Sequence, residues 1–152
     1  MTALALTIRT AIERAISRFN LPDSEAAVRL LLMVAAHESG GFTYCKQKGG
    51  PALGIFQMEP ATYADVCNYL ERTGRFPALN TKWRPTRMVI DVEFAAGMAR
   101  ALFSRIPEPL PDPDDLQALA EYAKKYWNTE LGKATPEKYL TAYKHHVLGD
   151  DV

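Results

Sequence analysis

The sequence predicts a mainly α-helical protein in which residues 1–152 form a single domain. Helix-start signals recur along the chain, and no segment alternates apolar and polar residues for long enough to indicate a strand. A chain of 152 residues, 47% of them hydrophobic, can bury one core but is short for two domains.

The first helix is expected within residues 1–19, where apolar side chains recur at helical spacing. This stripe comprises Leu4, Ile8, Ala11, Ile12, Ala15, Ile16 and Phe19. The segment lacks a basic start, and Arg9, Glu13 and Arg14 interrupt its apolar run, so we expect no signal peptide. No stretch approaches the roughly 20 apolar residues of a membrane span, so no stable membrane insertion is expected.

The second helix should be the buried centre of the fold. Asp23 or Ser24 can cap its start, and it should run to about Ser39. Within residues 28–36 only Arg29 is polar, and a helix that is apolar nearly all round is normally surrounded by other elements.

Four further segments have helical length and a recognisable start. They run from Pro60 to near Gly74, from Thr86 to about Arg105, from Asp112 onward and from Thr135 onward. Asp112 and Thr135 each precede a proline, which is favoured at the first helical position. Residues 75–84 are an expected loop, and residues 106–113 an expected proline-stiffened connector.

The composition excludes several classes of function. Lys plus Arg and Asp plus Glu both number 18, so no global basic field recruits nucleic acid, and a local basic patch stays open. Cys45 and Cys67 are too few for a disulfide scaffold or a zinc site; free thiols are favoured, and a single bridge stays open. His37 and Glu38 could begin a zinc-protease motif, but the second histidine would fall at Gly41. We expect no metal and no cofactor.

Glu38 is the candidate catalytic residue. The spacing of Val28, Leu31 and Ala35 continues to Glu38, which places a carboxyl on the core-facing side of the second helix at its end. Partial burial disfavours the charged form, and so does the negative helix end, by roughly 0.3–1 kcal/mol. These effects predict a raised pKa, as a general acid requires. The alternative is a glutamate paired with an arginine or held by backbone amides.

A second motif follows at residues 54–62, GIFQMEPAT. Glycine at Gly54 allows a tight turn against a ligand, and Gln57 offers a donor and an acceptor to sugar groups. Glu38-Ser39, a loop and this motif together resemble the soluble lytic transglycosylase domain of the lysozyme superfamily. That family's pattern is Glu-Ser, a loop, then Gly-Leu-Met-Gln-Ile-x-Pro-x-Thr. The resemblance spans roughly residues 24–143 and is strongest at residues 35–62.

The resemblance implies a lysozyme-like fold whose buried central helix carries the catalytic Glu38. It implies cleavage of the MurNAc-GlcNAc β-1,4 bond of peptidoglycan, with one carboxyl forming a 1,6-anhydro ring. Its likeness is to bacteriophage endolysins and virion-associated enzymes. We therefore expect a monomer made in the host cytoplasm that reaches the wall in the periplasm or from the phage particle, either carried in the virion or released through a holin lesion.

The resemblance also assigns supporting roles. It implies that Ser39 shapes the site and that Gln57 and Tyr122 line the sugar subsites, with Tyr122 near Glu38. Phe56 replaces the usual methionine as an apolar platform. The family's loop serine is missing here, and position 123 is alanine where asparagine is usual.

Other residues keep two interpretations. Tyr126, Trp127 and Asn128 are candidates for sugar binding, although the aromatic rings could be core. Glu59 could favour a helix start, or could position water for hydrolysis as in a goose-type lysozyme; Asp91 is another candidate for that role. A hydrolytic muramidase and a non-catalytic wall-binding or virion structural domain are therefore the alternatives.

Overall fold

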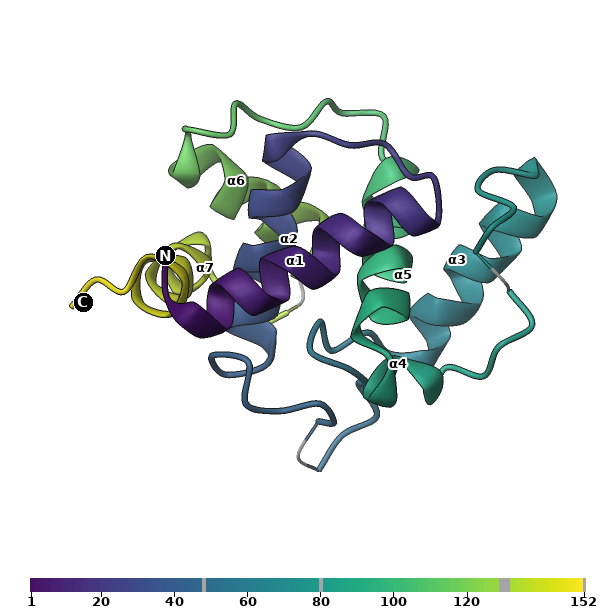
Figure 1. Cartoon of the computed structure of the whole chain (residues 1–152), viewed down its shortest axis with the longest axis horizontal. Coiled ribbons are helices and arrows are strands. Elements are labelled where there is room, and N and C mark those ends of the chain that lie inside the picture. The colour runs from purple at the N-terminus through teal and green to yellow at the C-terminus, as the bar shows by residue number, and fades with distance from the viewer. Residues whose placement is uncertain (48, 80, 129–131, 152) are drawn as a thin grey trace.

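The computed structural model describes residues 1–47, 49–79, 81–128 and 132–151. It is mainly helical, as the sequence predicts, and within the described residues extended pairing is limited to isolated bridges that join Lys46 with Leu53 and Leu53 with Met58. The helices (Figure 1) are α1 (Ala3–Arg18), α2 (Glu25–Glu38), α3 (Pro60–Thr73), α4 (Arg87–Ile90), α5 (Val92–Ser104), α6 (Leu116–Ala123) and α7 (Pro136–Ala142). Two π-helical turns, η1 (Lys124–Asn128) and η2 (Tyr143–Leu148), extend α6 and α7.

Helix α2 is the buried centre of the fold, which confirms the prediction. It contacts α1, α5, α6, α7 and η2, and every residue from Ala26 to Ala36 except Arg29 is buried. Arg29 stays at the surface because its guanidinium pairs with Glu25 at 2.9 Å and with Asp114 at 2.9 Å. Burial of an almost continuous apolar helix fixes its position, and hence that of Glu38 at its end.

The expected ends of α2 and α3 are also confirmed. The Ser24 hydroxyl accepts a hydrogen bond from the Ala27 amide at 3.0 Å and so caps the start of α2. After its end, Gly40 and Gly41 adopt left-handed conformations. Helix α3 has Pro60 in its first turn and ends on Gly74, which is also left-handed.

Two expected helix boundaries are wrong. Residues 86–105 form two helices, because Asp91 is extended; its carboxylate caps α5 through the Phe94 amide at 2.9 Å and pairs with Arg87 at 3.0 Å. Helix α6 is capped by Asp115, whereas Asp112 instead accepts a hydrogen bond from the Asp114 amide in the preceding turn.

The apolar stripe of α1 is largely buried, apart from the half-buried Ala11 and the exposed Leu4. Leu4 is 51% exposed, while Ala5 takes the buried position next to it. The start of the chain is joined to its carboxyl-terminal segment, because the Thr2 amide donates a hydrogen bond to the Val147 carbonyl at 2.9 Å. Figure 1 shows the two termini on the same side of the molecule.

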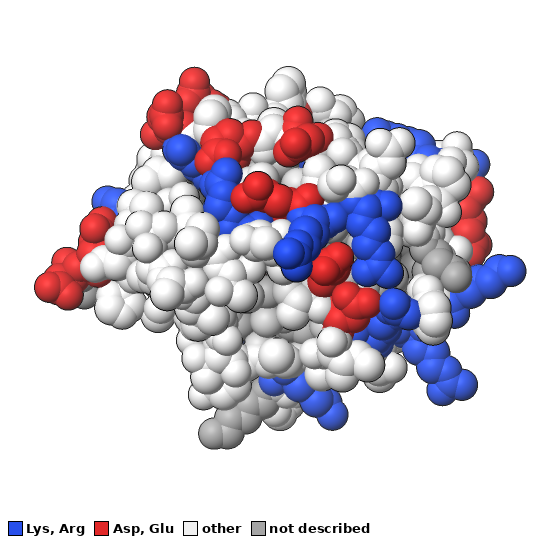
Figure 2. All heavy atoms as spheres, in the orientation of Figure 1, with Lys and Arg blue, Asp and Glu red and all other residues white. Residues whose placement is uncertain are grey.

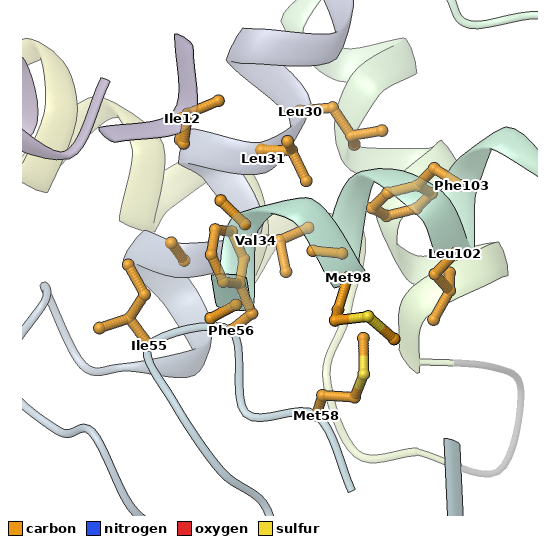
Figure 3. Packing of buried hydrophobic residues seen from close by; sticks show 14 of the residues in the cluster. Ile12, Leu30, Leu31, Val34, Ile55, Phe56, Met58, Met98, Leu102 and Phe103 are labelled. Carbon is orange, nitrogen blue, oxygen red and sulfur yellow. The ribbon is translucent and has the colours of Figure 1, made fainter. Parts of the chain in front are cut away.

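One hydrophobic core joins α2 and α5 to the loop between α2 and α3. In Figure 3, Phe56 and Met58 from this loop lie beside Val34 of α2 and Met98 of α5. The loop therefore packs on the same core as α2, and this packing fixes the loop relative to Glu38 at the end of the helix.

The surface carries both signs of charge. Figure 2 shows Lys and Arg interspersed with Asp and Glu on the face in view, in agreement with equal numbers of acidic and basic residues. Within the described part of the chain, no helix is both long and apolar enough to cross a bilayer.

Candidate active site

Glu38 opens into a cleft of about 580 Å³ at the end of α2. The cleft lies between the loop after α2, the start of α3 and the turn η1. Its walls carry polar, aromatic and aliphatic residues: Glu38, Tyr44, Gln47, Ala52, Gln57, Met58, Glu59, Thr62, Leu102, Trp127, Asn128 and Gly132. Such a mixture suits a ligand that has both hydroxyl groups and apolar faces.

The Glu38 carboxyl is partly buried and accepts a hydrogen bond from the Tyr139 hydroxyl at 2.6 Å. Burial raises the pKa of Glu38 above its ordinary value, and the Tyr139 hydrogen bond opposes this increase. Among the described residues no cation lies within ion-pair distance of this carboxyl, and no backbone amide donates to it. The alternative of a glutamate paired with an arginine or held by backbone amides therefore finds no support among the described residues.

Tyr139 is a site residue that the sequence interpretation missed. It lies on α7 and is fully buried, and its ring contacts His37 with centroids 4.5 Å apart. Burial and the nearby Glu38 raise the pKa of its hydroxyl, while a hydrogen bond with the Asn128 side chain lowers it. Tyr139 and Tyr143 are four residues apart on a predicted helix, so the sequence indicates that they share one face of it. This spacing alone could not identify Glu38 as the partner of Tyr139.

Asn128, at the end of η1, is held close to this pair. The Lys124 ammonium donates to the Asn128 amide oxygen at 2.9 Å and to the Gly132 carbonyl at 2.9 Å. The Asn128 side chain lies near enough to the Tyr139 hydroxyl to lower its pKa.

Gly54 lies in the loop that carries Gln57 into the cleft, and it packs closely against α4. Its φ is +76°, and a Cβ there would lie 2.6 Å from the Met88 carbonyl oxygen at α4. The glycine therefore allows backbone to pack against backbone. The same turn holds Gln57, whose φ is +54° and whose side-chain amide donates to the Gly54 carbonyl at 2.7 Å.

Gly54→Ala should destabilise the protein more than Gly74→Ala does. Both glycines are left-handed, a conformation that costs about 1–2 kcal/mol for other residues. A Cβ at Gly74 meets no atom within 4 Å, whereas at Gly54 it collides with the Met88 carbonyl. Urea unfolding of the two variants measures the difference; equal losses of unfolding free energy would show that the close approach at Gly54 is unimportant.

Four sequence-predicted residues line the cleft with Glu38: Gln57, Glu59, Trp127 and Asn128. The Trp127 ring is held by Phe103 and Phe56, at centroid distances of 5.5 Å and 6.4 Å. Tyr44, Gln47 and Thr62 also line the cleft, although no motif singled them out. They come from a loop and a helix start whose shape the sequence pattern does not specify.

Ser39 and Phe56 support the site from outside the cleft. Ser39 is fully buried; its hydroxyl donates to the Ala35 carbonyl and accepts from the Phe42 amide, both at 2.6 Å. It therefore fixes the turn after Glu38. Phe56 is 1% exposed and belongs to the core (Figure 3), so the expected platform for a sugar ring is wrong.

The expected position of Tyr122 beside Glu38 is also wrong. Its hydroxyl donates to the Glu108 carbonyl at 2.9 Å, in the connector between α5 and α6. Tyr126 packs on the Tyr122 ring, with centroids 4.6 Å apart, and is absent from the cleft lining. The aromatic row of α6 and η1 therefore splits, with Trp127 facing the cleft.

The two further carboxylates have different surroundings. Glu59 precedes α3, makes no side-chain cap and is exposed in the cleft. Asp91 is engaged by Arg87 and the Phe94 amide and lines a separate groove near α4. Of the two residues proposed to position water, only Glu59 lies in the cleft with Glu38.

The described residues include no cluster of three or more His, Cys, Asp and Glu side chains that could hold a metal. Cys45 is exposed and Cys67 is buried, and neither forms a disulfide. No protein-family model, curated protein or solved structure matches the chain. What the cleft can do chemically therefore follows from its own residues.

Proposed function

We propose that the protein is a peptidoglycan lytic transglycosylase with a lysozyme-like fold. The observation that carries this proposal is the partly buried Glu38 carboxyl, held by Tyr139 in the wall of a cleft, where burial raises its pKa. A general acid must retain its proton near the working pH, and burial of a carboxyl is how proteins achieve this.

The cleft suits a glycan strand. Its volume of about 580 Å³ accommodates a small ligand. Trp127 offers an aromatic face to the apolar side of a sugar ring, while Gln57 and Asn128 offer amides to hydroxyl and acetamido groups. Such pairs of stacking and hydrogen-bonding groups position a sugar without any charged contact.

The reaction that fits one carboxyl proceeds in two stages. Glu38 gives its proton to the glycosidic oxygen as the bond from the MurNAc anomeric carbon breaks, and the GlcNAc end leaves as an alcohol. The Glu38 carboxylate then takes the proton from the 6-hydroxyl of the same MurNAc, whose oxygen bonds to the anomeric carbon and closes a 1,6-anhydro ring. Glu38 ends protonated, as it began, and no water is consumed. The Tyr139 hydrogen bond stabilises the carboxylate between the stages.

Hydrolysis is the second candidate, because Glu59 places another carboxyl in the cleft. An inverting glycosidase uses such a group to activate water across the sugar, with the two carboxyl groups roughly 6.5–9.5 Å apart. In either case the substrate is the glycan strand of a cell wall. We place the protein, as a monomer, among bacteriophage enzymes that act there from the particle or after release.

The products distinguish the two reactions. Purified peptidoglycan is digested in water enriched in ¹⁸O, and the muropeptides are analysed by mass spectrometry. Ring closure predicts products one water lighter than the hydrolytic ones and free of the label. Labelled reducing ends that disappear in Glu59→Gln would instead establish a muramidase. Binding of peptidoglycan without cleavage would favour the non-catalytic wall-binding domain.

A further inference from the structure

A second pocket, of about 210 Å³, lies at the carboxyl-terminal half of α5 beneath the connector between α5 and α6. Arg100 and Phe103 of α5, Arg75 and Tyr122 contribute to its lining. The pocket shares no lining residue with the cleft of Glu38. Figure 1 shows the connector, in green, at the top of the molecule, where it spans from α5 to α6.

Arg100 gives this pocket an unusual character. Its side chain is 6% exposed, and among the described residues Ser39 is the only other buried polar one. The Nε group donates to the Pro22 carbonyl at 2.8 Å. No carboxylate of the described chain lies within 4 Å of the guanidinium, and its Nη groups make no hydrogen bond to a described residue. An arginine this buried is normally paired, because an isolated charge is costly to desolvate. The unbonded Nη groups are not sealed from solvent, since no fully buried side-chain nitrogen or oxygen among the described residues lacks a partner.

The surrounding charges leave this cation only partly compensated. Burial lowers the pKa of Arg100, and the like charge of Arg75 lowers it further; Tyr122 and Asp23 oppose these effects without reaching ion-pair distance. Arg75 lines the same pocket and is held by the Tyr69 hydroxyl and the Ser104 carbonyl, at 2.7 Å and 3.2 Å. Two arginines therefore border one small pocket, and the guanidinium of Arg75 is already held by these partners and by the Phe76 ring, 4.6 Å from its centroid.

We propose that this pocket binds a small carboxylate that carries a short apolar group, such as the carboxyl-terminal residue of a peptide. A guanidinium matches a carboxylate with two parallel hydrogen bonds. Ile106 and Leu110 of the connector and the Phe103 ring supply the apolar wall. Glu108 also borders the pocket, but its carboxylate is drawn to Lys125, 3.7 Å away.

A ligand bound in this pocket can affect the cleft of Glu38 through the Phe103 ring. The Phe103 ring contacts Tyr122 on the pocket side and Trp127 on the cleft side, at centroid distances of 6.0 Å and 5.5 Å. A ligand that presses on Phe103 should change the surroundings of Trp127. Tryptophan fluorescence in a Trp83→Phe background, where Trp127 is the remaining tryptophan, reports this change.

The test is calorimetric titration with N-acetyl-leucine, its uncharged amide and inorganic phosphate at constant ionic strength. We expect saturable one-to-one binding of the carboxylate, and binding roughly tenfold or more weaker for the amide, because the charge-assisted hydrogen bonds are lost. Phosphate should bind more weakly than the carboxylate, since it has no apolar part. Absence of saturable carboxylate binding, or equal binding of the amide, would overturn the proposal; phosphate binding as tight as the carboxylate would overturn the apolar component.

Variants locate the site. Arg100→Met should weaken carboxylate binding by about tenfold or more, while Arg105→Met, a matched change outside the pocket lining on the same helix end, should leave it unchanged. Thermal unfolding shows whether Arg100→Met folds. If it does not, Arg75→Gln tests the site instead, because this variant keeps Arg100. It should weaken carboxylate binding about threefold through loss of one charge. Unchanged binding in the folded Arg100→Met or in Arg75→Gln would place the carboxylate elsewhere.

Discussion

Glu38→Gln should lower the rate of peptidoglycan cleavage by about 10²–10⁴-fold, the usual contribution of a general acid-base group. Glutamine keeps the shape of the side chain and can still meet the Tyr139 hydroxyl, but it has no proton to give to the glycosidic oxygen. Turbidity loss of purified peptidoglycan and release of soluble muropeptides measure the rate. Glu59→Gln is the matched control, since it alters a carboxyl in the same cleft, and under the transglycosylase proposal it should retain most of the activity.

Glu38→Gln should also fold at least as stably as the parent protein at neutral pH. Burial raises the pKa of Glu38, so the folded state binds more protons than the unfolded state between the ordinary pKa and the folded one. Stability is therefore lost as pH rises through that window, and Glu38→Gln should remove this loss. Urea unfolding at several pH values checks the sign. Cleavage by Glu38→Gln at the parent rate would exclude Glu38 as the acid. So would a loss of stability, relative to the parent protein, that is much larger at neutral pH than at acid pH.

Tyr139→Phe should reduce cleavage by about tenfold, as expected when one hydrogen bond to a charged group is lost. The hydroxyl donates to Glu38 at 2.6 Å and lowers the pKa of the carboxyl. Without it, the pKa of Glu38 rises further, and the carboxylate formed between the two stages is less stable. The pH-rate profile should therefore shift to higher pH on its basic side, where the acid form is lost.

Tyr143→Phe is the control for that experiment. Tyr143 is also buried and follows one helical turn after Tyr139, but it makes no hydrogen bond to Glu38. Its profile should match that of the parent protein. A Tyr139→Phe profile that coincides with both, with unchanged rate, would mean that the hydroxyl only fills space in the core.

The sequence predicts those parts of the site that local patterns determine. The continuous apolar run from residue 28 to residue 36 identifies α2 as the central helix and places Glu38 at its end. Ser24, Pro60 and Gly74 mark helix ends through cap, proline and left-handed glycine preferences that act within a few residues. Each of these features depends on neighbours along the chain.

Features that depend on distant contacts could not be predicted in this way. Tyr139 reaches Glu38 across 101 residues of sequence, whereas Tyr122, favoured by the family resemblance, bonds to the connector instead. The break at Asp91 arises because its carboxylate has two local partners, the Phe94 amide and Arg87, that compete with a continuous helix. The role of Gly54 depends on how close α4 approaches the loop.

Direct titration of the Glu38 side chain tests whether this carboxyl can hold the proton that cleavage requires. Its carboxyl carbon can be followed by ¹³C NMR across pH and assigned by its absence in Glu38→Gln. We expect a midpoint above the ordinary value of 4.5, displaced further upward in Tyr139→Phe. A midpoint at or below 4.5 would mean that Glu38 is ionised at neutral pH and would contradict its role as the proton donor.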